Sequence, residues 1–382
     1  MPELRASLAV LALAAILPLG STPAAVAAAP PGMVPVELSR LAGFPDHYVV
    51  GINDLGQVVG SAQGGDLAPH AVLWSPRGGA TDLGPGLAAD VNERGQVLGL
   101  ELRAPTTPYR HKPWIWTDGR RTAVTPADAA WAYAPAINDS GAVPVNYSIS
   151  ATRTDHDRVA VWQDGRHTEL SPSGPELWVY AINDAGVVAG GYASFAAQDF
   201  AAVRCAAGTC TRLGGSPGYG SYTPEAVNET GVVVGNRGTV ALRWEGDTAT
   251  VLSDNGRVAH GEEALNERGD TVGWAADADG TPRAVLWPAG GKQVDLGVPG
   301  PSEAVAINER GDVVGWVASG ESATPRGFLW REGRVTYLDP PTGHYSMPVA
   351  INDHGVVVGH TTGTDSTTRP TLWTPVTTTL GR

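Results

Sequence analysis

One short motif occurs eight times in the chain, and this repetition constrains the fold more than any other feature of the sequence. Each copy begins with asparagine and an acidic residue, reaches a glycine two positions later, and usually continues into a Val-Val-Gly-like segment. The asparagines are separated by 39, 46, 45, 45, 38, 42 and 44 residues. They are Asn53, Asn92, Asn138, Asn183, Asn228, Asn266, Asn308 and Asn352. A period of about 43 residues indicates a chain built from equal structural units.

A second landmark follows every motif and keeps the same register. It is a short apolar segment that ends in tryptophan in seven of the units, and in the fourth unit Cys205 occupies the corresponding position. The tryptophans are Trp74, Trp116, Trp162, Trp244, Trp287, Trp330 and Trp373. Because they recur once per unit, we expect them to be large core residues between adjacent sheets.

Each unit fits four short antiparallel strands joined by turns. The first is a small or branched segment such as 304–307, and the Asn-acid-x-Gly turn connects it to the second strand. The third resembles 284–287, and the fourth resembles 294–297 or 337–339. Asparagine can hydrogen-bond the backbone two residues on, and glycine supplies the left-handed conformation that closes a hairpin.

These units predict an all-β protein, a β-propeller of eight four-stranded antiparallel blades, with seven blades as the alternative. A lone sheet of this size exposes two faces, whereas sheets arranged around an axis cover each other. Segment 34–38 and segment 376–380 both resemble a fourth strand. We expect one of them to complete the blade where the two ends of the chain meet.

The composition supports this fold class and excludes others. The 49 glycines and 30 prolines make up about a fifth of the 382 residues, which is too many for an all-helical protein. A hydrophobic content of 42% excludes a disordered chain. The formal charge of −13, with no cluster of basic residues to offset it, argues against nucleic acid as a partner.

The first 27 residues have the features of a secretory signal peptide. An apolar run at 7–19 follows Arg5, and the small-residue triplet 25–27 provides a cleavage site before Ala28. The run is shorter than the roughly 20 residues that span a bilayer. We therefore expect a secreted, extracellular protein with a single propeller domain at 28–382. We expect no membrane span in the mature chain and a monomeric state.

The two cysteines, Cys205 and Cys210, enclose a short Gly-containing segment. Two cysteines that close a tight hairpin in an exported protein are expected to be oxidised. The sequence therefore predicts a disulfide bond in the unit that lacks the tryptophan.

The repeats resemble the HAF repeats of bacterial extracellular proteins. That family is named for a His-Ala-Phe triplet that precedes the Leu-Trp strand and accompanies an Ala-Ile-Asn-Asp-x-Gly-x-Val-Val-Gly run. Here the triplet is His70-Ala71-Val72 in the first unit and Arg326-Gly327-Phe328 in the seventh. The resemblance covers about 48–380 and implies export and a repeat architecture. It implies no particular activity or functional residue.

The sequence contains no pattern that indicates a metal or another cofactor. The acid of each turn and its asparagine supply too few oxygens for calcium, so we interpret them as turn residues. The nine histidines lack zinc-binding spacing, and no nucleophile elbow or phosphate-binding loop is present. We therefore expect neither a metal nor a cofactor.

The segments that precede the first strand differ between units, and several are rich in aromatic and ionisable residues. If the first strand is the innermost, these segments converge on one mouth of the axial channel, where loops on a rigid scaffold form a binding site. The candidate ligand-binding residues are His47, Tyr48, Trp131, Tyr133, Trp178, Tyr180, Tyr222, His260, Glu262, Glu303 and Tyr345.

Two functions are compatible with these residues. The first is a secreted interaction module that binds an extracellular carbohydrate or peptide at this mouth. The second is an exported polysaccharide hydrolase or lyase on the same scaffold, with Glu262, Glu263 and Glu303 as its acids. Propellers support both classes, so the fold does not decide between them. The absence of a catalytic motif favours the binding module, and the catalytic residues of an enzyme stay unknown.

Overall fold

A computed structural model of the protein describes residues 32–376, apart from 66, 103–110, 151–157, 172–175, 195, 215–219, 320–323 and 344. The predicted signal peptide lies outside the described residues, as does all of 376–380 except Val376. Within the described part, no helix is long and apolar enough to cross a membrane.

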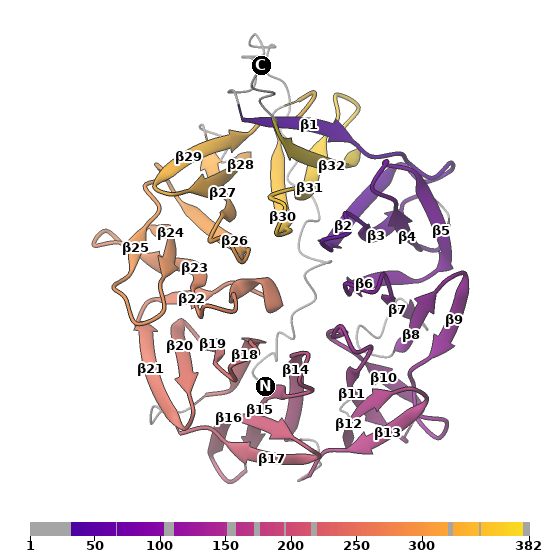
Figure 1. The fold of residues 1–382 in the computed structure, drawn as a ribbon, viewed down its shortest axis with the longest axis vertical. Helices are drawn as coiled ribbons and strands as arrows, with labels where there is room; N and C mark the ends of the chain where they lie inside the picture. Colours follow the sequence, from indigo (N-terminus) through magenta and orange to yellow (C-terminus); the bar gives the residue numbers. More distant parts are fainter. Residues whose placement is uncertain are drawn as a thin grey trace, which may run out of the picture.

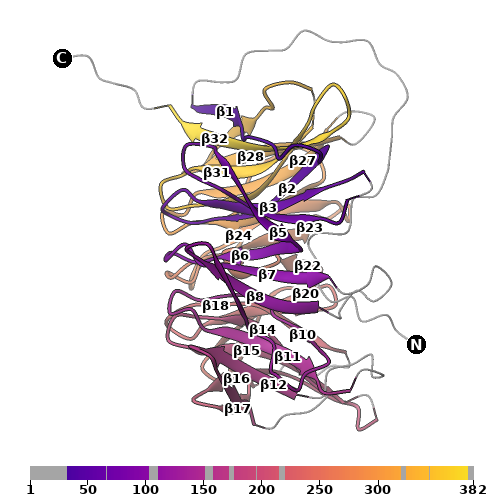
Figure 2. The same ribbon diagram turned by 90° about the vertical axis from the view of Figure 1, so that its right-hand side faces the viewer.

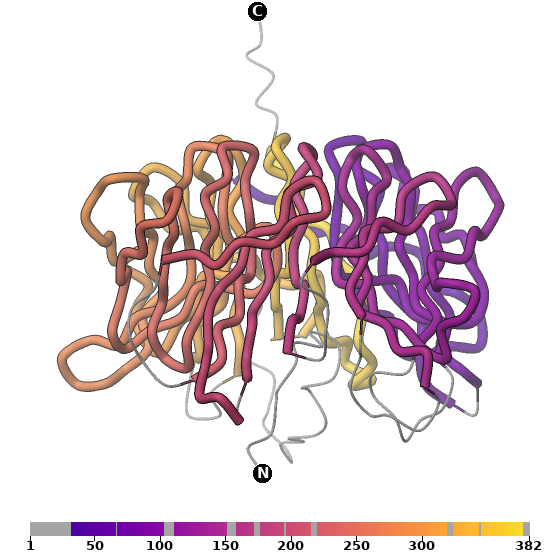
Figure 3. Tube along the Cα trace, turned by 90° about the horizontal axis from the view of Figure 1, so that it is seen from below, coloured from indigo at the N-terminus to yellow at the C-terminus, as the bar shows by residue number. Residues whose placement is uncertain are grey.

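The fold is an all-β propeller with eight blades around a central axis (Figure 1). Seen from the side, the blades form a short cylinder, with turns at both rims (Figures 2 and 3). Each blade has four antiparallel strands, the first of them nearest the axis. A pairing of Ala132 with His111 joins the second and third blades into one continuous sheet. The eight-blade prediction is therefore confirmed.

The first four blades occupy the N-terminal half of the chain. Blade 1 contains β2 (Asp46–Ile52), β3 (Val58–Gln63), β4 (His70–Trp74) and β5 (Ala80–Pro85). Blade 2 contains β6 (Leu87–Val91), β7 (Val97–Leu102), β8 (His111–Thr117) and β9 (Arg120–Ala123). Blade 3 contains β10 (Trp131–Tyr133), β11 (Val143–Ser148), β12 (Arg158–Gln163) and β13 (Arg166–Glu169). Blade 4 contains β14 (Leu177–Ile182), β15 (Val188–Ser194), β16 (Asp199–Ala206) and β17 (Thr209–Arg212).

The other four blades complete the circle. Blade 5 contains β18 (Tyr222–Val227), β19 (Val233–Arg237), β20 (Val240–Glu245) and β21 (Thr248–Ser253). Blade 6 contains β22 (Gly256–Val258), the 3-10 turn η1 (Glu262–Ala264), β23 (Thr271–Ala276), β24 (Pro282–Trp287) and β25 (Val294–Asp295). Blade 7 contains β26 (Ser302–Ile307), β27 (Val313–Ser319), β28 (Thr324–Arg331) and β29 (Arg334–Leu338). Blade 8 contains β30 (Ser346–Ile351), β31 (Val357–Thr362), β32 (Thr368–Pro375) and β1 (Met33–Glu37).

The N-terminal strand closes the ring. β1 pairs antiparallel with β32, placing Pro35 opposite Trp373, so β1 is the outermost strand of blade 8. Figure 1 shows indigo β1 beside yellow β32. An ion pair of 3.0 Å between Arg369 and Glu37 also joins the two strands. Of the two candidate closing segments, the structure thus uses the N-terminal one.

Every Asn-acid-x-Gly motif forms the same turn between the first and second strands. The asparagine side-chain oxygen accepts a hydrogen bond from the backbone N–H four residues on, as in Gln57 to Asn53 at 2.9 Å. The sequence predicts a hydrogen bond to the asparagine side chain from the backbone N–H two residues on. Some turns contain this bond in addition; for example, the N–H of Arg94 donates to the Asn92 side chain. Gly56 has a φ of +74°, which glycine adopts at low cost.

The same asparagines also join each blade to the next. Each side-chain N–H₂ donates to the backbone oxygen of the next asparagine along the chain, at 2.8–3.2 Å. Asn352 donates to Asn53, which closes the circle across 299 residues of sequence. All eight asparagines are buried.

The eight acidic residues form a second circle of hydrogen bonds between the units. Each carboxylate accepts a hydrogen bond from the backbone N–H of the acid in the preceding unit, at 2.5–2.9 Å. We call the asparagines and acids together the turn ring. The acids are Asp54, Glu93, Asp139, Asp184, Glu229, Glu267, Glu309 and Asp353.

The tryptophans of the third strands fill the space between blades, as expected. Trp74, Trp162, Trp244, Trp287 and Trp373 are buried, whereas Trp116 and Trp330 are partly buried. Trp74, for example, belongs to a cluster that includes Val358 and Leu372 of blade 8. The apolar cores therefore lie between neighbouring sheets.

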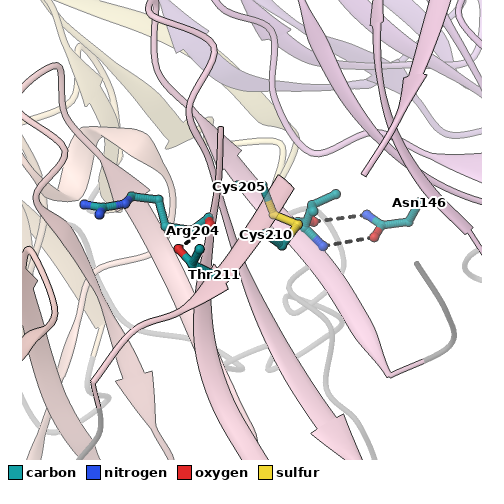
Figure 4. The surroundings of a disulfide bond; sticks show 6 residues. Asn146, Arg204, Cys205, Cys210 and Thr211 are labelled. Carbon is teal, nitrogen blue, oxygen red and sulfur yellow. Dashed lines mark hydrogen bonds between the residues drawn. A yellow bond between two sulfur atoms is a disulfide. The ribbon is translucent and has the colours of Figure 1, made fainter. Parts of the chain in front are cut away.

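The predicted disulfide is confirmed. Cys205 at the end of β16 faces Cys210 on β17, and the two are bonded (Figure 4). Beside it, the Asn146 side chain of blade 3 accepts from the N–H of Val179 and donates to its oxygen, both at 3.0 Å. This clamp connects blades 3 and 4 at the level of the disulfide.

Replacing one asparagine of the turn ring should destabilise the whole protein. Asn308→Ala leaves the buried N–H of Asp312 without its 2.9 Å partner and removes the bond to Asn352. We expect a loss of about 1–3 kcal/mol in the free energy of unfolding, measured by urea denaturation. The exposed Asn255, changed to alanine as a control, should alter stability by less than about 0.5 kcal/mol. Equal effects of the two substitutions would contradict a structural role for the ring.

Loss of the disulfide should have a smaller effect, because the loop that it closes is short. Cys205→Ala/Cys210→Ala should lower the free energy of unfolding by roughly 2 kcal/mol. A reducing agent should lower the melting temperature of the natural protein and leave that of the double variant unchanged. A reductant effect on the double variant would show that the reagent acts elsewhere.

Candidate functional site

The inner strands of the blades enclose a cavity of about 520 Å³ on the propeller axis, here called the axial channel. Every blade contributes to its wall. Near the turn ring the wall is a collar of branched side chains that directly precede the asparagines, such as Ile137, Ile182 and Ile351. Farther along the axis the wall is aromatic and ionisable. The volume is in the range of small-molecule sites, so a ligand side chain or chain end fits within it.

The wall of the channel has a strongly uneven charge. Among the described residues it contains twelve carboxyl groups, the eight of the turn ring and four deeper ones, and a single basic residue, His260. The deeper ones are Asp90, Glu225, Glu262 and Glu263. Neither lysine nor arginine lines the described channel. The described residues also contain no group of three or more His, Cys, Asp or Glu side chains that could hold a metal ion.

The repeat shows which of these acids the architecture requires. All eight units carry a turn-ring acid, and its carboxylate joins two units. Asp90, in contrast, lies two residues before its asparagine, where the other units have glycine or alanine. Glu262 lies four residues before Asn266, where the others have alanine, valine or proline. The deeper acids are thus departures from a repeat that folds without them.

Blade 6 departs most from the common pattern. Its first strand, β22, ends at Val258, and the chain then forms η1 before it rejoins the pattern at Leu265. Gly261, with a φ of +89°, precedes η1. η1 packs between β18 of blade 5 and β26 of blade 7, and in Figure 1 this segment extends from β22 toward the centre. It carries Glu262 and Glu263 into the channel.

The surroundings of η1 disfavour charged carboxylates. Burial, together with the nearby Asp90, raises the pKa of Glu263 to about 8, although a 3.3 Å hydrogen bond from the N–H of Ile351 opposes the shift. Burial also raises the pKa of Glu262 well above its usual value, and Asp90 and Glu263 add to the shift. Glu262 lies deep within the ring, yet its side chain is open to the channel itself.

Asp90 has a structural partner as well as a place in the wall. Its carboxylate accepts from the N–H of Ile137 in blade 3 at 2.9 Å and from that of Val91 at 2.7 Å. In blade 3 a valine, Val145, stands where the other second strands have glycine, and the pairing of β10 with β11 stops at Tyr133. Asp90 therefore satisfies a backbone N–H that strand pairing leaves free. Burial raises its pKa to about 6 despite these bonds.

A second polar group lies between blades 5 and 6. Glu225 is buried, and its two oxygens contact the Asn236 side-chain nitrogen at 3.0 Å and His260 Nδ1 at 3.1 Å. The hydrogen bond with Glu225 raises the pKa of His260, and burial opposes that rise. His260 keeps 48% of its side chain exposed. The half-buried Glu303 also acts on His260 electrostatically.

The aromatic part of the wall comes from blades 3 and 4. Tyr133 lies at the end of β10, and Trp178 and Tyr180 lie on β14. Burial raises the pKa of the Tyr180 hydroxyl, with smaller contributions from Glu225 and Tyr133, which line the same cavity. Aromatic rings and carboxyl groups thus share the wall of one cavity, which suits a cation or a polar planar group.

Of the eleven candidate residues, five line the channel: Tyr133, Trp178, Tyr180, His260 and Glu262. Three others are half-buried and lie outside the channel wall. Tyr48 packs edge-on against His360 at 5.6 Å, Tyr345 donates to the sulfur of Met347 at 3.1 Å, and Glu303 lies beside His260.

The remaining three candidates are core residues, and the structure corrects their assignment. His47, Trp131 and Tyr222 have exposed fractions of 0%, 1% and 3%, so a ligand cannot reach them. His47 Nε2 accepts from the N–H of Leu41 at 2.8 Å, and burial lowers its pKa to about 4. Tyr222 packs against Trp244, with ring centres 6.0 Å apart.

Sequence reasoning missed Asp90 and Glu225, and it named Glu263 only as a possible acid of an enzyme. The sequence nevertheless marks all three, because each is an acidic residue at a position of the repeat where most other units have a small or apolar residue. Aligning the eight units on their asparagines isolates these positions without any other sequence.

Comparison with known proteins shows the fold and no family. No family model and no curated protein matches the sequence. The β-propeller domain of the trilobed protease from Pyrococcus furiosus, described as having an open velcro topology, is similar with a TM-score of 0.51 and 9% identity. The match covers 78% of this chain and all of that domain. In this chain, by contrast, β1 closes the ring.

Pyrococcus horikoshii acylaminoacyl peptidase is similar with a TM-score of 0.50 and 9% identity, over 79% of this chain. The match covers 54% of the peptidase, so this chain corresponds to about half of its length. Both likenesses establish a β-propeller scaffold.

The pKa of Glu263 predicts how stability depends on pH. A carboxyl group with a pKa near 8 in the folded state and near 4.5 in the unfolded state keeps a proton that the unfolded chain has lost. Stability should therefore fall as the pH rises from about 5 to 8. In Glu263→Gln the fall in melting temperature across this range should be smaller, whereas Glu332→Gln, at an exposed turn, should behave like the natural protein. Parallel curves for all three proteins would refute the pKa assignment.

Proposed function

We propose that the protein is a secreted binding module whose axial channel receives a positively charged peptide segment. The observation that carries this proposal is the excess of carboxyl groups in the channel wall at positions where the repeat needs none. Asp90, Glu225, Glu262 and Glu263 come from three different blades and line one cavity. The propeller holds them in place, and the wall supplies almost no positive charge to balance them.

Electrostatics favours a cationic ligand. Field lines from like charges concentrate in an enclosed channel with low-dielectric walls, which attracts ions of opposite charge. Lysine, arginine or an amino terminus would replace the missing positive charge and make charge-assisted hydrogen bonds with the carboxylates. The aromatic side chains of Trp178 and Tyr180, in the wall of the same channel, add cation–π attraction.

A peptide fits these features better than a neutral polysaccharide. Sugar binding depends on aromatic planes and neutral hydrogen-bonding groups, whereas twelve carboxyl groups line this wall. A basic side chain is long and narrow, which matches a channel that the inner strands surround on all sides. The cavity holds a short segment only, so the rest of the partner would rest on the rim.

Export is supported by the sequence. The apolar run at 7–19 and the small residues at 25–27 form a signal peptide, and the Cys205–Cys210 bond suits an oxidising compartment. The resemblance to HAF repeats of bacterial extracellular proteins points the same way.

A second candidate is an exported hydrolase or lyase, and the pKa shifts favour it. Glu263 with a pKa near 8 would be a general acid, and a carboxylate with a lower pKa would be its base. Asp90 is poorly suited to that second role because its carboxylate already accepts two backbone hydrogen bonds. Reducing-end assays on polysaccharides test this candidate directly.

Calorimetry with tetralysine and tetraglutamate tests the binding proposal. The protein that begins at Ala28 should bind tetralysine, more weakly at 0.5 M than at 0.05 M salt, and should not bind tetraglutamate. Glu262→Gln should weaken binding about tenfold. Glu332→Gln removes the same charge far from the channel and should leave binding unchanged. Absence of tetralysine binding, or equal loss in both variants, would exclude the channel as a cation site.

A further inference from the structure

The two glutamates of η1 lie in a place that holds several negative groups together. Glu262 of blade 6 lines the axial channel together with Asp90 of blade 2 and with Asp139 and Asp184 of the turn ring. These three carboxyl groups add to the rise in the pKa of Glu262. Among the described residues no group hydrogen-bonds the Glu262 side chain. Like charges gathered around one cavity oppose simultaneous ionisation.

The elements packed around η1 supply little positive charge to offset the repulsion between these carboxylates. β18 presents Glu225, β26 presents Glu303, and β23 carries no titratable residue. In the segment that leads to η1, His260 is already bonded to Glu225. Arg257 acts on His260 and Glu303.

The contact between Glu263 and blade 8 is compatible with a neutral carboxyl group. The N–H of Ile351 donates to one Glu263 oxygen at 3.3 Å, a long bond for a charged acceptor. A protonated carboxyl keeps an oxygen that accepts this bond. Both glutamates can therefore stay in position without a charge.

We propose that Glu262 and Glu263 are neutral carboxylic acids in the empty channel and release their protons to solvent when a cationic ligand enters. This inference rests on the proposed function for the identity of the ligand. In each exchange one O–H bond of a glutamate breaks, the proton passes to water or buffer, and the carboxylate pairs with the ammonium group. The raised pKa of both glutamates supports the neutral starting state.

Proton exchange makes binding depend on pH. Below about pH 6 the ligand must displace protons that are tightly held, so affinity is low. Affinity rises as the pH passes through the pKa of Glu263, about 8, and levels off above it, where this glutamate is already ionised. The channel would hold its ligand in neutral or alkaline surroundings and release it in acid.

Carbon NMR of side-chain-labelled glutamate tests the starting state without any ligand. Two carboxyl resonances should titrate with midpoints well above the usual value of about 4.5, that of Glu263 near 8, and Glu262→Gln and Glu263→Gln should each remove one of them. Glutamine has the shape of the neutral acid, so we expect both variants to fold. Midpoints near 4.5 for all glutamates would overturn the inference, whatever tetralysine does.

Calorimetry with tetralysine at pH 7, in phosphate and in Tris, tests the exchange. Because the ionisation enthalpies of the two buffers differ, proton release makes the observed binding enthalpy differ between them. We expect release of one to two protons from the natural protein and from Glu332→Gln, and almost none from Glu262→Gln/Glu263→Gln. Binding with equal enthalpies in both buffers would overturn the exchange. If the carboxyl groups of Glu262 and Glu263 titrate at raised pH but tetralysine does not bind, the proposed peptide ligand is rejected, whereas the neutral state of the two glutamates is established.

Discussion

The hydrogen-bonded turn ring is the constraint on which the rest of the structure depends. Each asparagine closes its own hairpin and donates to the next asparagine, so a single side chain sets both the turn and the distance between two blades. The bond from Asn352 to Asn53 joins blade 8 to blade 1 and so closes the circle of asparagines. At the outer edge of blade 8, β1 pairs with β32 and brings the two ends of the chain together. Because these bonds fix the first strands, the side chains on those strands can vary without loss of the fold.

That freedom explains why function can be inferred from departures within the repeat. Eight copies of one unit define what the architecture needs at each position, and Glu262, Glu263 and Asp90 fall outside that definition. Random departures would be scattered over the molecule, whereas these meet in one cavity. Asp90 also shows that a departure can serve both purposes, since it supports the Ile137 N–H where Val145 disturbs strand pairing.

The sequence predicts the fold well because blade count, turns and core tryptophans repeat at fixed intervals. It predicts the site only in part, because residues next to each other on a first strand face opposite ways. Trp178, five residues before its asparagine, lines the channel. His47 and Tyr222, six residues before theirs, are buried and pack edge-on against the tryptophan of their own blade. The bonds between asparagines were also beyond sequence reasoning, since their partners lie 38–46 residues away or at the other end of the chain.

An acidic channel without bound cations lowers the stability of the protein that contains it. Burial and mutual repulsion hold protons on Glu263 and Glu262 that the unfolded chain would release at neutral pH, and this difference favours unfolding. Substitutions that neutralise these acids should therefore stabilise the empty protein and weaken its binding, a trade-off common at functional sites. If the acids were only structural, their removal would instead lower stability, as it would for an asparagine of the turn ring. The sign of the stability change thus separates the two roles.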